Sequence, residues 1–150
     1  MIRVVYREPR FRTKETGGKK SVFCAIRKRW LQLTGEEWVR QNFVQYLVSE
    51  LQYPASLIAV EKELVLHDLK KRFDVLVYDS HHKPWMLVEC KEPAVALNED
   101  VLQQVLRYNI SVPVPYLVIT NGSNTAGWKK QHNELVLLSE LPRWGDIPIQ

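Results

Sequence analysis

The stretch KRFDVLVYDSHHKPWMLVECKEP, residues 71–93, carries the pattern that decides the fold. Two apolar runs are separated by the short polar segment DSHHKP, an arrangement typical of a β-hairpin. Both runs nevertheless contain charged side chains: Asp74 in the first, and Glu89 and Lys91 in the second. Because burying an uncompensated charge costs roughly several kcal/mol, these three side chains need a physical reason to be there.

Alternation along the two strands assigns these residues to faces. In the second strand, Glu89 and Lys91 point to one face and Cys90 to the other, where Met86 and Val88 complete an apolar surface. In the first strand, alternation separates two groups. One face receives Phe73, Val75 and Val77, and the other receives Asp74, Leu76 and Tyr78.

The register of the hairpin determines whether the charged residues meet. If residues 79–84 form the loop and Tyr78 faces Trp85, antiparallel pairing places Asp74 directly opposite Glu89. Like charges in that position repel, and a divalent cation between the carboxylates removes the conflict. Mg²⁺ fits best, because it binds one or two carboxylates and keeps positions for water and phosphate oxygens, and Mn²⁺ is the expected substitute. Lys91 would then hold a phosphate oxygen or orient the attacking water.

The same three charges also fit purely structural roles. Asp74 could pair with Arg72 or Lys91 in a structural salt bridge, and Glu89 with Lys91 could form a solvated stripe on an open sheet face. A second acid-x-Lys triplet at residues 68–70 lies in a polar turn, where solvated charges need no partner. His81 and His82 are expected to be exposed loop residues.

The rest of the pattern predicts an α/β fold with a mixed central sheet flanked by helices. Thr34 and Glu37 have the spacing of a capping box, and apolar residues follow at helical spacing. Asn98 is the N-cap candidate of a second helix. Strand patterns cover residues 57–66, 71–78, 85–91, 115–120 and 134–138. The expected order is therefore helix, three strands, helix and strand, with one more strand near the end.

Charge is distributed unevenly along the 150 residues. Residues 1–35 contain ten Lys and Arg against two Glu, a net charge of +8, and the remainder carries −4. We expect a basic, partly flexible arm over residues 1–20 and a single domain over residues 21–150. A basic arm on a mildly acidic body suits a polyanion such as nucleic acid, and a solvated tail is an equal alternative.

Several classes of protein are disfavoured by the composition. Cys24 and Cys90 lack CxxC spacing, which argues against a disulfide framework or a structural zinc site and favours a reducing, cytoplasmic location. The apolar runs are too short to span a bilayer, and no apolar segment of the signal-peptide type follows the basic N-terminus. We therefore expect no membrane association.

Taken together, these motifs resemble the PD-(D/E)xK nuclease superfamily. They resemble most closely the nuclease domain at the N-terminus of type I restriction enzyme R subunits, especially small stand-alone bacterial versions. The matching text is KRFDVLVYD, PWMLVECKEP, QQVLRYN and YLVITNG, preceded by TGEEWVRQ, so the likeness covers about residues 21–123. It implies a restriction-endonuclease-like core. R subunits carry a helicase-type motor after this domain, and we expect no ATP-driven translocation from the 150 residues.

The resemblance assigns roles to the charged residues of the hairpin. It implies Asp74 and Glu89 as metal ligands and Lys91 as the catalytic lysine. It also implies the main-chain carbonyl of Cys90 as a further metal ligand. The literal Pro-Asp pair of the superfamily is replaced by Phe73-Asp74 in this chain.

Two further motifs lie on the expected helices. Gln104 and Tyr108 match a Q-x-x-x-Y motif, which the resemblance implies holds the substrate or orders the site. A polar packing pair on one helix face is the alternative. Glu37 would be the first-helix acid that some branches add to the metal site. A purely capping role is its alternative, and Glu36 is its rival.

The sequence thus predicts a Mg²⁺-dependent endodeoxyribonuclease, of restriction or repair type, that hydrolyses DNA phosphodiester bonds. One alternative is a catalytically inactive nuclease-fold protein that binds nucleic acid or a protein partner. Another is a structural protein whose charged triad is an ion-pair network. DNA is the expected partner, and the resemblance is compatible with a homodimer and with separate restriction-system subunits.

Overall fold

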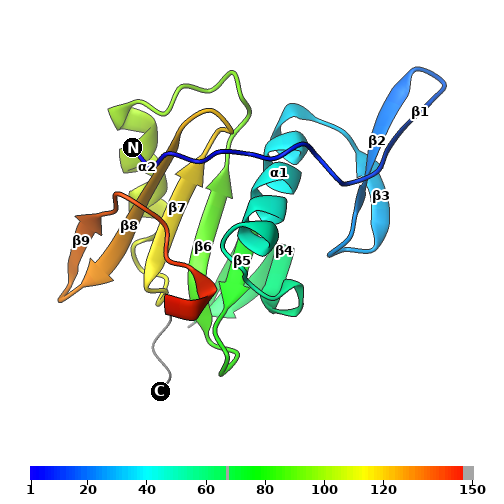
Figure 1. Ribbon diagram of the computed structural model, residues 1–150. Helices are drawn as coiled ribbons and strands as arrows, with labels where there is room; N and C mark the ends of the chain where they lie inside the picture. The colour runs from blue at the N-terminus through cyan, green and yellow to red at the C-terminus, as the bar shows by residue number, and fades with distance from the viewer. Residues whose placement is uncertain (67, 147–150) are drawn as a thin grey trace.

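The computed structural model describes residues 1–66 and 68–146, and its centre is a six-stranded sheet (Figure 1). The strand order is β4-β5-β6-β7-β8-β9. These strands are β4 (Ile58–Leu66), β5 (Leu69–Tyr78), β6 (Pro84–Cys90), β7 (Tyr116–Thr120), β8 (Thr125–Gln131) and β9 (Glu134–Leu137). The expected α/β class is confirmed.

The sheet is mixed, as predicted. Strands β6 and β7 run parallel, whereas the other neighbouring pairs of this sheet are antiparallel. Parallel neighbours need a crossover connection, and α2 (Glu99–Asn109) supplies it between β6 and β7. The crossover brings α2 onto the sheet face that carries Glu89.

Both helices begin where their capping residues predict. The Thr34 side chain accepts a hydrogen bond of 3.0 Å from the main-chain N–H of Glu37 at the start of α1 (Gly35–Ser49). The Asn98 side chain accepts one of 3.0 Å from Val101 at the start of α2. Each bond satisfies a main-chain donor that has no partner within its helix.

The helices bury opposite faces of the sheet and create two apolar clusters. The cluster under α1 includes Phe43 and Leu47 of the helix with Val88 and Cys90 of β6. The cluster under α2 includes Leu106 of the helix together with sheet residues that point to the other face of their strands: Leu76, Leu87, Leu117 and Ile119. The expected apolar face of β6 is confirmed.

The predicted faces of β5 fail at two neighbouring residues, Phe73 and Asp74. Phe73 packs in the α2 cluster, although alternation placed it with Val75 and Val77. The pairing of β4 with β5 is interrupted between Val60–Val75 and Lys62–Phe73, and the intervening Glu61 has a φ of 54°. Beside this irregularity, Phe73 packs on the α2 side and the Asp74 carboxylate reaches Arg40 of α1.

The register between β5 and β6 agrees with the expected one over its central pairs. Val75 pairs with Val88, and Val77 pairs with Met86. At the turn, however, Tyr78 faces Pro84 instead of Trp85, because a bulge follows Val77. The turn is tight because the Asp79 carboxylate accepts hydrogen bonds from the main-chain N–H groups of residues 81 and 83. The two histidines of this turn are exposed, as expected.

A second, three-stranded sheet occupies the basic N-terminal part of the chain. It consists of β1 (Thr13–Thr16), β2 (Lys19–Cys24) and β3 (Arg29–Gln32). The expected boundary between arm and domain, at residues 20 and 21, therefore falls inside β2. Gly17 and Gly18 adopt φ values of 59° and 78° and form the two-residue turn between β1 and β2. The flexibility of the arm stays a prediction.

Strand β8 is a second element that the pattern did not predict. Its first four residues are buried, and a Cβ added to Gly127 would lie 3.0 Å from Ile2 Cδ1. Gly127 is thus required by the close approach of the N-terminal segment. In the part of the chain that the structure describes, neither helix has the length and apolar character needed to cross a membrane.

Candidate active site

The candidate site lies where β5 and β6 stop pairing. Their ladder ends at Val75 and Val88, and the same register carried one residue further sets Asp74 opposite Glu89. At this point the main-chain N–H of Cys90 donates to Asp74 Oδ2 over 2.9 Å. A carboxylate oxygen therefore takes the place of a main-chain acceptor between the two strands.

Glu89 lies close to Asp74, as the hairpin register predicts, and Lys91 lies beside Glu89. Burial, followed by the charge of Asp74, raises the pKa of Glu89 to about 7, whereas Lys91 lowers it. Lys91 Nζ lies 3.7 Å from Glu89 Oε1, and the two side chains are 33% and 25% exposed. Burial and the neighbouring carboxylate thus both disfavour the charged form of Glu89.

Helix α2 forms the opposite wall of this site. Gln104 and Tyr108 line an open pocket of about 160 Å³ together with Glu89 and Lys91. Tyr108 is 55% exposed, so it is not a buried packing partner of Gln104. Lys71 lies 4.2 Å from the centre of the Tyr108 ring and donates to the main-chain carbonyl of the same residue. The structure thus brings four of the predicted site residues to one pocket.

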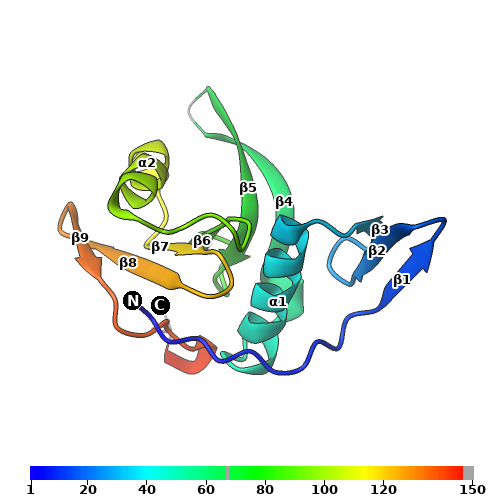
Figure 2. The same ribbon diagram turned by 90° about the horizontal axis from the view of Figure 1, so that it is seen from above.

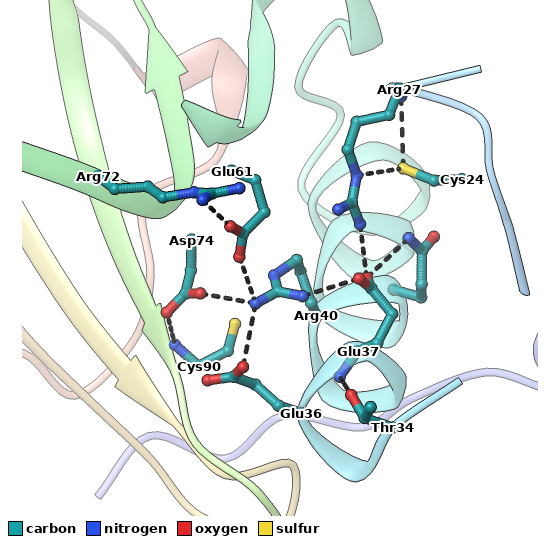
Figure 3. Close-up of polar contacts among 11 residues, drawn as sticks. Cys24, Arg27, Thr34, Glu36, Glu37, Arg40, Glu61, Arg72, Asp74 and Cys90 are labelled. Atoms are coloured by element: carbon teal, nitrogen blue, oxygen red, sulfur yellow. Dashed lines mark hydrogen bonds and ion pairs between the residues drawn. The ribbon is translucent and has the colours of Figure 1, made fainter. Parts of the chain in front are cut away.

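Arg40 is the main residue that the sequence reasoning missed. Its guanidinium lies between α1 and the sheet, where Nη2 is 2.7 Å from both Asp74 Oδ1 and Glu61 Oε1 (Figure 3). The Arg40 side chain is only 5% exposed, and these carboxylates offset the cost of burying its charge. Helical spacing indicates the burial of this arginine, because Arg40 shares a helix face with the apolar residues Phe43 at i+3 and Leu47 at i+7.

Glu37 lies on the far side of Arg40 from Asp74 (Figure 3). Its carboxylate accepts hydrogen bonds of 2.7 Å from Arg27, 2.9 Å from Arg40 and 3.2 Å from Gln41. The structure therefore does not bring Glu37 to the predicted metal site, because three donors hold it elsewhere.

The rival first-helix acid, Glu36, faces the site instead. Its carboxylate lies 3.4 Å from Arg40 Nη2. Burial and the nearby charge of Asp74 raise its pKa, while Arg40 lowers it. The 100° step between successive helical residues thus sends the two acids to opposite sides of one arginine.

The salt-bridge alternatives for Asp74 are resolved by the same network. Arg72 pairs with Glu61, at 2.7 Å between Nε and Oε2. Asp74 pairs with Arg40, whereas the predicted partners were Arg72 and Lys91. Asp74 therefore does have a structural ion pair, and that pair occupies one of its two oxygens.

The oxygen atoms of this site fit Mg²⁺ better than a softer metal. Within residues 1–66 and 68–146, no group of three or more His, Cys, Asp or Glu side chains is arranged to hold a metal ion. The side chains that could hold such an ion are therefore Asp74 and Glu89, whose carboxylate oxygens are hard donors, with water completing the shell. The Cys90 thiol points into the α1 cluster and burial raises its pKa, so only its main-chain carbonyl suits a ligand role.

A family model described as the type I restriction enzyme R protein N terminus matches residues 35–142. The match extends from the start of α1 to beyond β9 and includes every residue of the candidate site. Strands β1 to β3 lie outside it. No curated protein matches the chain.

Proposed function

The chain belongs to the family of the type I restriction enzyme R protein N terminus, and from this premise we propose that it is a metal-dependent nuclease acting on DNA phosphodiester bonds. The observation that carries the proposal is the position of Glu89, which lines an open pocket with Lys91 at 3.7 Å. Burial, followed by the charge of Asp74, raises the pKa of this carboxyl to about 7.

Asp74 and Glu89 would hold Mg²⁺, or Mn²⁺ in its place, with the Cys90 carbonyl as a further oxygen. When bound, Mg²⁺ supplies electrostatic stabilisation of the charge that develops on the scissile phosphate and favours ionisation of the attacking water. The N–H of Cys90, 2.9 Å from Asp74 Oδ2, fixes the orientation of this carboxylate. Arg40 fixes it from the other side through Oδ1.

Lys91 has the reach and exposure for contact with the substrate. Its ammonium group is 3.7 Å from Glu89 and its side chain is 33% exposed, so a phosphate oxygen or an attacking water is accessible to it. Gln104 and Tyr108 line the same pocket and would position the phosphodiester. Binding that positions a reactant lowers the entropic part of the barrier.

A second candidate function follows from Arg40. Because Arg40 already neutralises Asp74, a catalytically inactive protein that binds nucleic acid or a protein partner would also keep this arrangement. The homodimer and the separate restriction-system subunits stay predictions.

Supercoiled plasmid incubated with Mg²⁺ or Mn²⁺ tests the proposal. We expect nicking or linearisation by the wild type and a loss of about 100-fold or more for Lys91→Ala, since a preorganised charge at a transition state contributes on that order. Lys83→Ala, in the exposed β5–β6 turn, is the matched control and should cut normally. Cutting that Lys91→Ala leaves unchanged would exclude the mechanism. Metal-independent binding without cutting would favour the inactive alternative.

A further inference from the structure

The small sheet formed by β1, β2 and β3 has two different faces. It lies beside α1, on the side away from α2 (Figure 2). Val22 and Cys24 are 0% and 1% exposed, so one face is directed to the protein. By alternation, the opposite face carries a group of cations and aromatic rings, which we name the basic–aromatic face. Its members are Arg12, Lys14, Lys19, Phe23 and Trp30.

The aromatic rings of this face hold two of its cations. Phe23 and Trp30 pack edge to face with 5.5 Å between ring centres. Arg12 Cζ lies 4.5 Å from the centre of Phe23, and Lys14 Nζ lies 4.3 Å from the centre of Trp30. Cations restricted in this way lose less conformational entropy when an anion binds. Glu15 is directed to the opposite face, across from Lys20.

A chain of ion pairs fixes the small sheet relative to the candidate site. Arg27, in the turn between β2 and β3, lies 2.7 Å from Glu37. Glu37 lies 2.9 Å from Arg40, and Arg40 lies 2.7 Å from Asp74. The four side chains are between 5% and 12% exposed, so solvent screens these contacts weakly.

We propose that the basic–aromatic face binds the phosphate backbone of the DNA that the site at Asp74 and Glu89 cleaves, an inference that rests on the proposed function. Two observations support it independently of charge counting. The cations are held in place on one sheet face, and buried ion pairs join the small sheet to the candidate site through Arg27. DNA is favoured over a membrane surface because cations cover the exposed rings. The face lies outside the residues that the family model matches.

A binding experiment without metal separates this inference from catalysis. Labelled duplex DNA of about 30 base pairs is titrated with protein in EDTA, at several salt concentrations, by fluorescence anisotropy. The logarithm of the binding constant falls as the logarithm of the salt concentration rises, and each lost phosphate contact makes this slope less steep by about 0.9. Arg12→Gln with Lys14→Gln should therefore make it less steep by about 1.8. We expect affinity to fall by about 10- to 100-fold at roughly 0.1 M salt.

The control is a double variant with the same change of charge, Arg3→Gln with Lys83→Gln. Arg3 follows the bridge between Ile2 and β8, and Lys83 precedes β6, so both exposed residues are remote from the small sheet. The control should keep the wild-type slope.

Three results would overturn the inference: no duplex binding by the wild type, an unchanged slope in the Arg12 and Lys14 variant, or equal losses in both double variants. Failure of the proposed function gives a different result. In that case the wild type binds duplex with the expected dependence on Arg12 and Lys14 but never cuts plasmid with Mg²⁺ or Mn²⁺.

Discussion

Glu89→Gln should change how the stability of the metal-free protein depends on pH. Burial and the charge of Asp74 raise the pKa of Glu89 from 4.5 to about 7, so the folded protein binds this proton more tightly than the unfolded chain. The resulting stabilisation is complete below pH 4.5 and is lost as the pH rises through about 7. Gln stays neutral at every pH, and the variant therefore lacks that loss.

The size of the effect follows from the pKa. One pKa unit corresponds to about 1.4 kcal/mol. A rise in pKa from 4.5 to about 7 therefore changes the free energy of unfolding by about 3 kcal/mol between pH values below 4.5 and pH values above 7. The stability of Glu89→Gln relative to wild type should increase by up to that amount as the pH rises. In a protein of this size, 3 kcal/mol corresponds to roughly 6–12 °C in melting temperature.

Urea and thermal unfolding in EDTA, at several values between pH 4 and pH 8, measure this difference. Glu134→Gln, in the edge strand β9, is a control at an exposed glutamate and should follow the wild-type curve. Mg²⁺ at pH 8 should stabilise the wild type and leave Glu89→Gln unaffected, because only the wild type offers the second carboxylate. Parallel curves for wild type and Glu89→Gln would refute the reasoning that Asp74 and Glu89 confront each other.

The remaining predictions concern residues of α1. Arg40→Met leaves buried carboxylates without their cation and should lower the free energy of unfolding by about 3–5 kcal/mol in urea, whereas Arg107→Met, at an exposed position of α2, should change it little. Thr34→Ala removes the N-cap bond of 3.0 Å to Glu37 and should cost about 1 kcal/mol in the same measurement, with Thr34→Asp close to wild type. An undiminished stability of either variant would contradict the role given to its side chain.

The sequence predicted the elements whose patterns are local. The caps at Thr34 and Asn98 and the alternation of β6 each depend on residues a few positions apart. The opposition of Asp74 to Glu89 was also predictable, because a short hairpin permits few registers. The bulge after Val77 moved the turn by one residue without disturbing the pairs that position the site.

What the sequence could not predict depends on contacts between distant segments. Phe73 and Asp74 depart from alternation beside the irregularity at Glu61 in the neighbouring strand β4, and the sequence of β5 does not indicate that departure. Gly127 in β8 is small because the N-terminal Ile2 packs against it. Glu36 and Glu37 are separated by Arg40, whose partners come from α1, β4 and β5. Periodicity identifies the helix face of such a residue but not its partners.

The hydrogen bond from the Cys90 amide to Asp74 gives the site a built-in spectroscopic reporter. The chemical shift of an amide proton that donates to a side-chain carboxylate, rather than to a main-chain carbonyl, depends on the charge of that carboxylate. The nitrogen and proton resonances of the Cys90 amide should therefore shift when Asp74 binds an ion. One backbone signal would follow occupancy of the centre in solution, without DNA and without turnover.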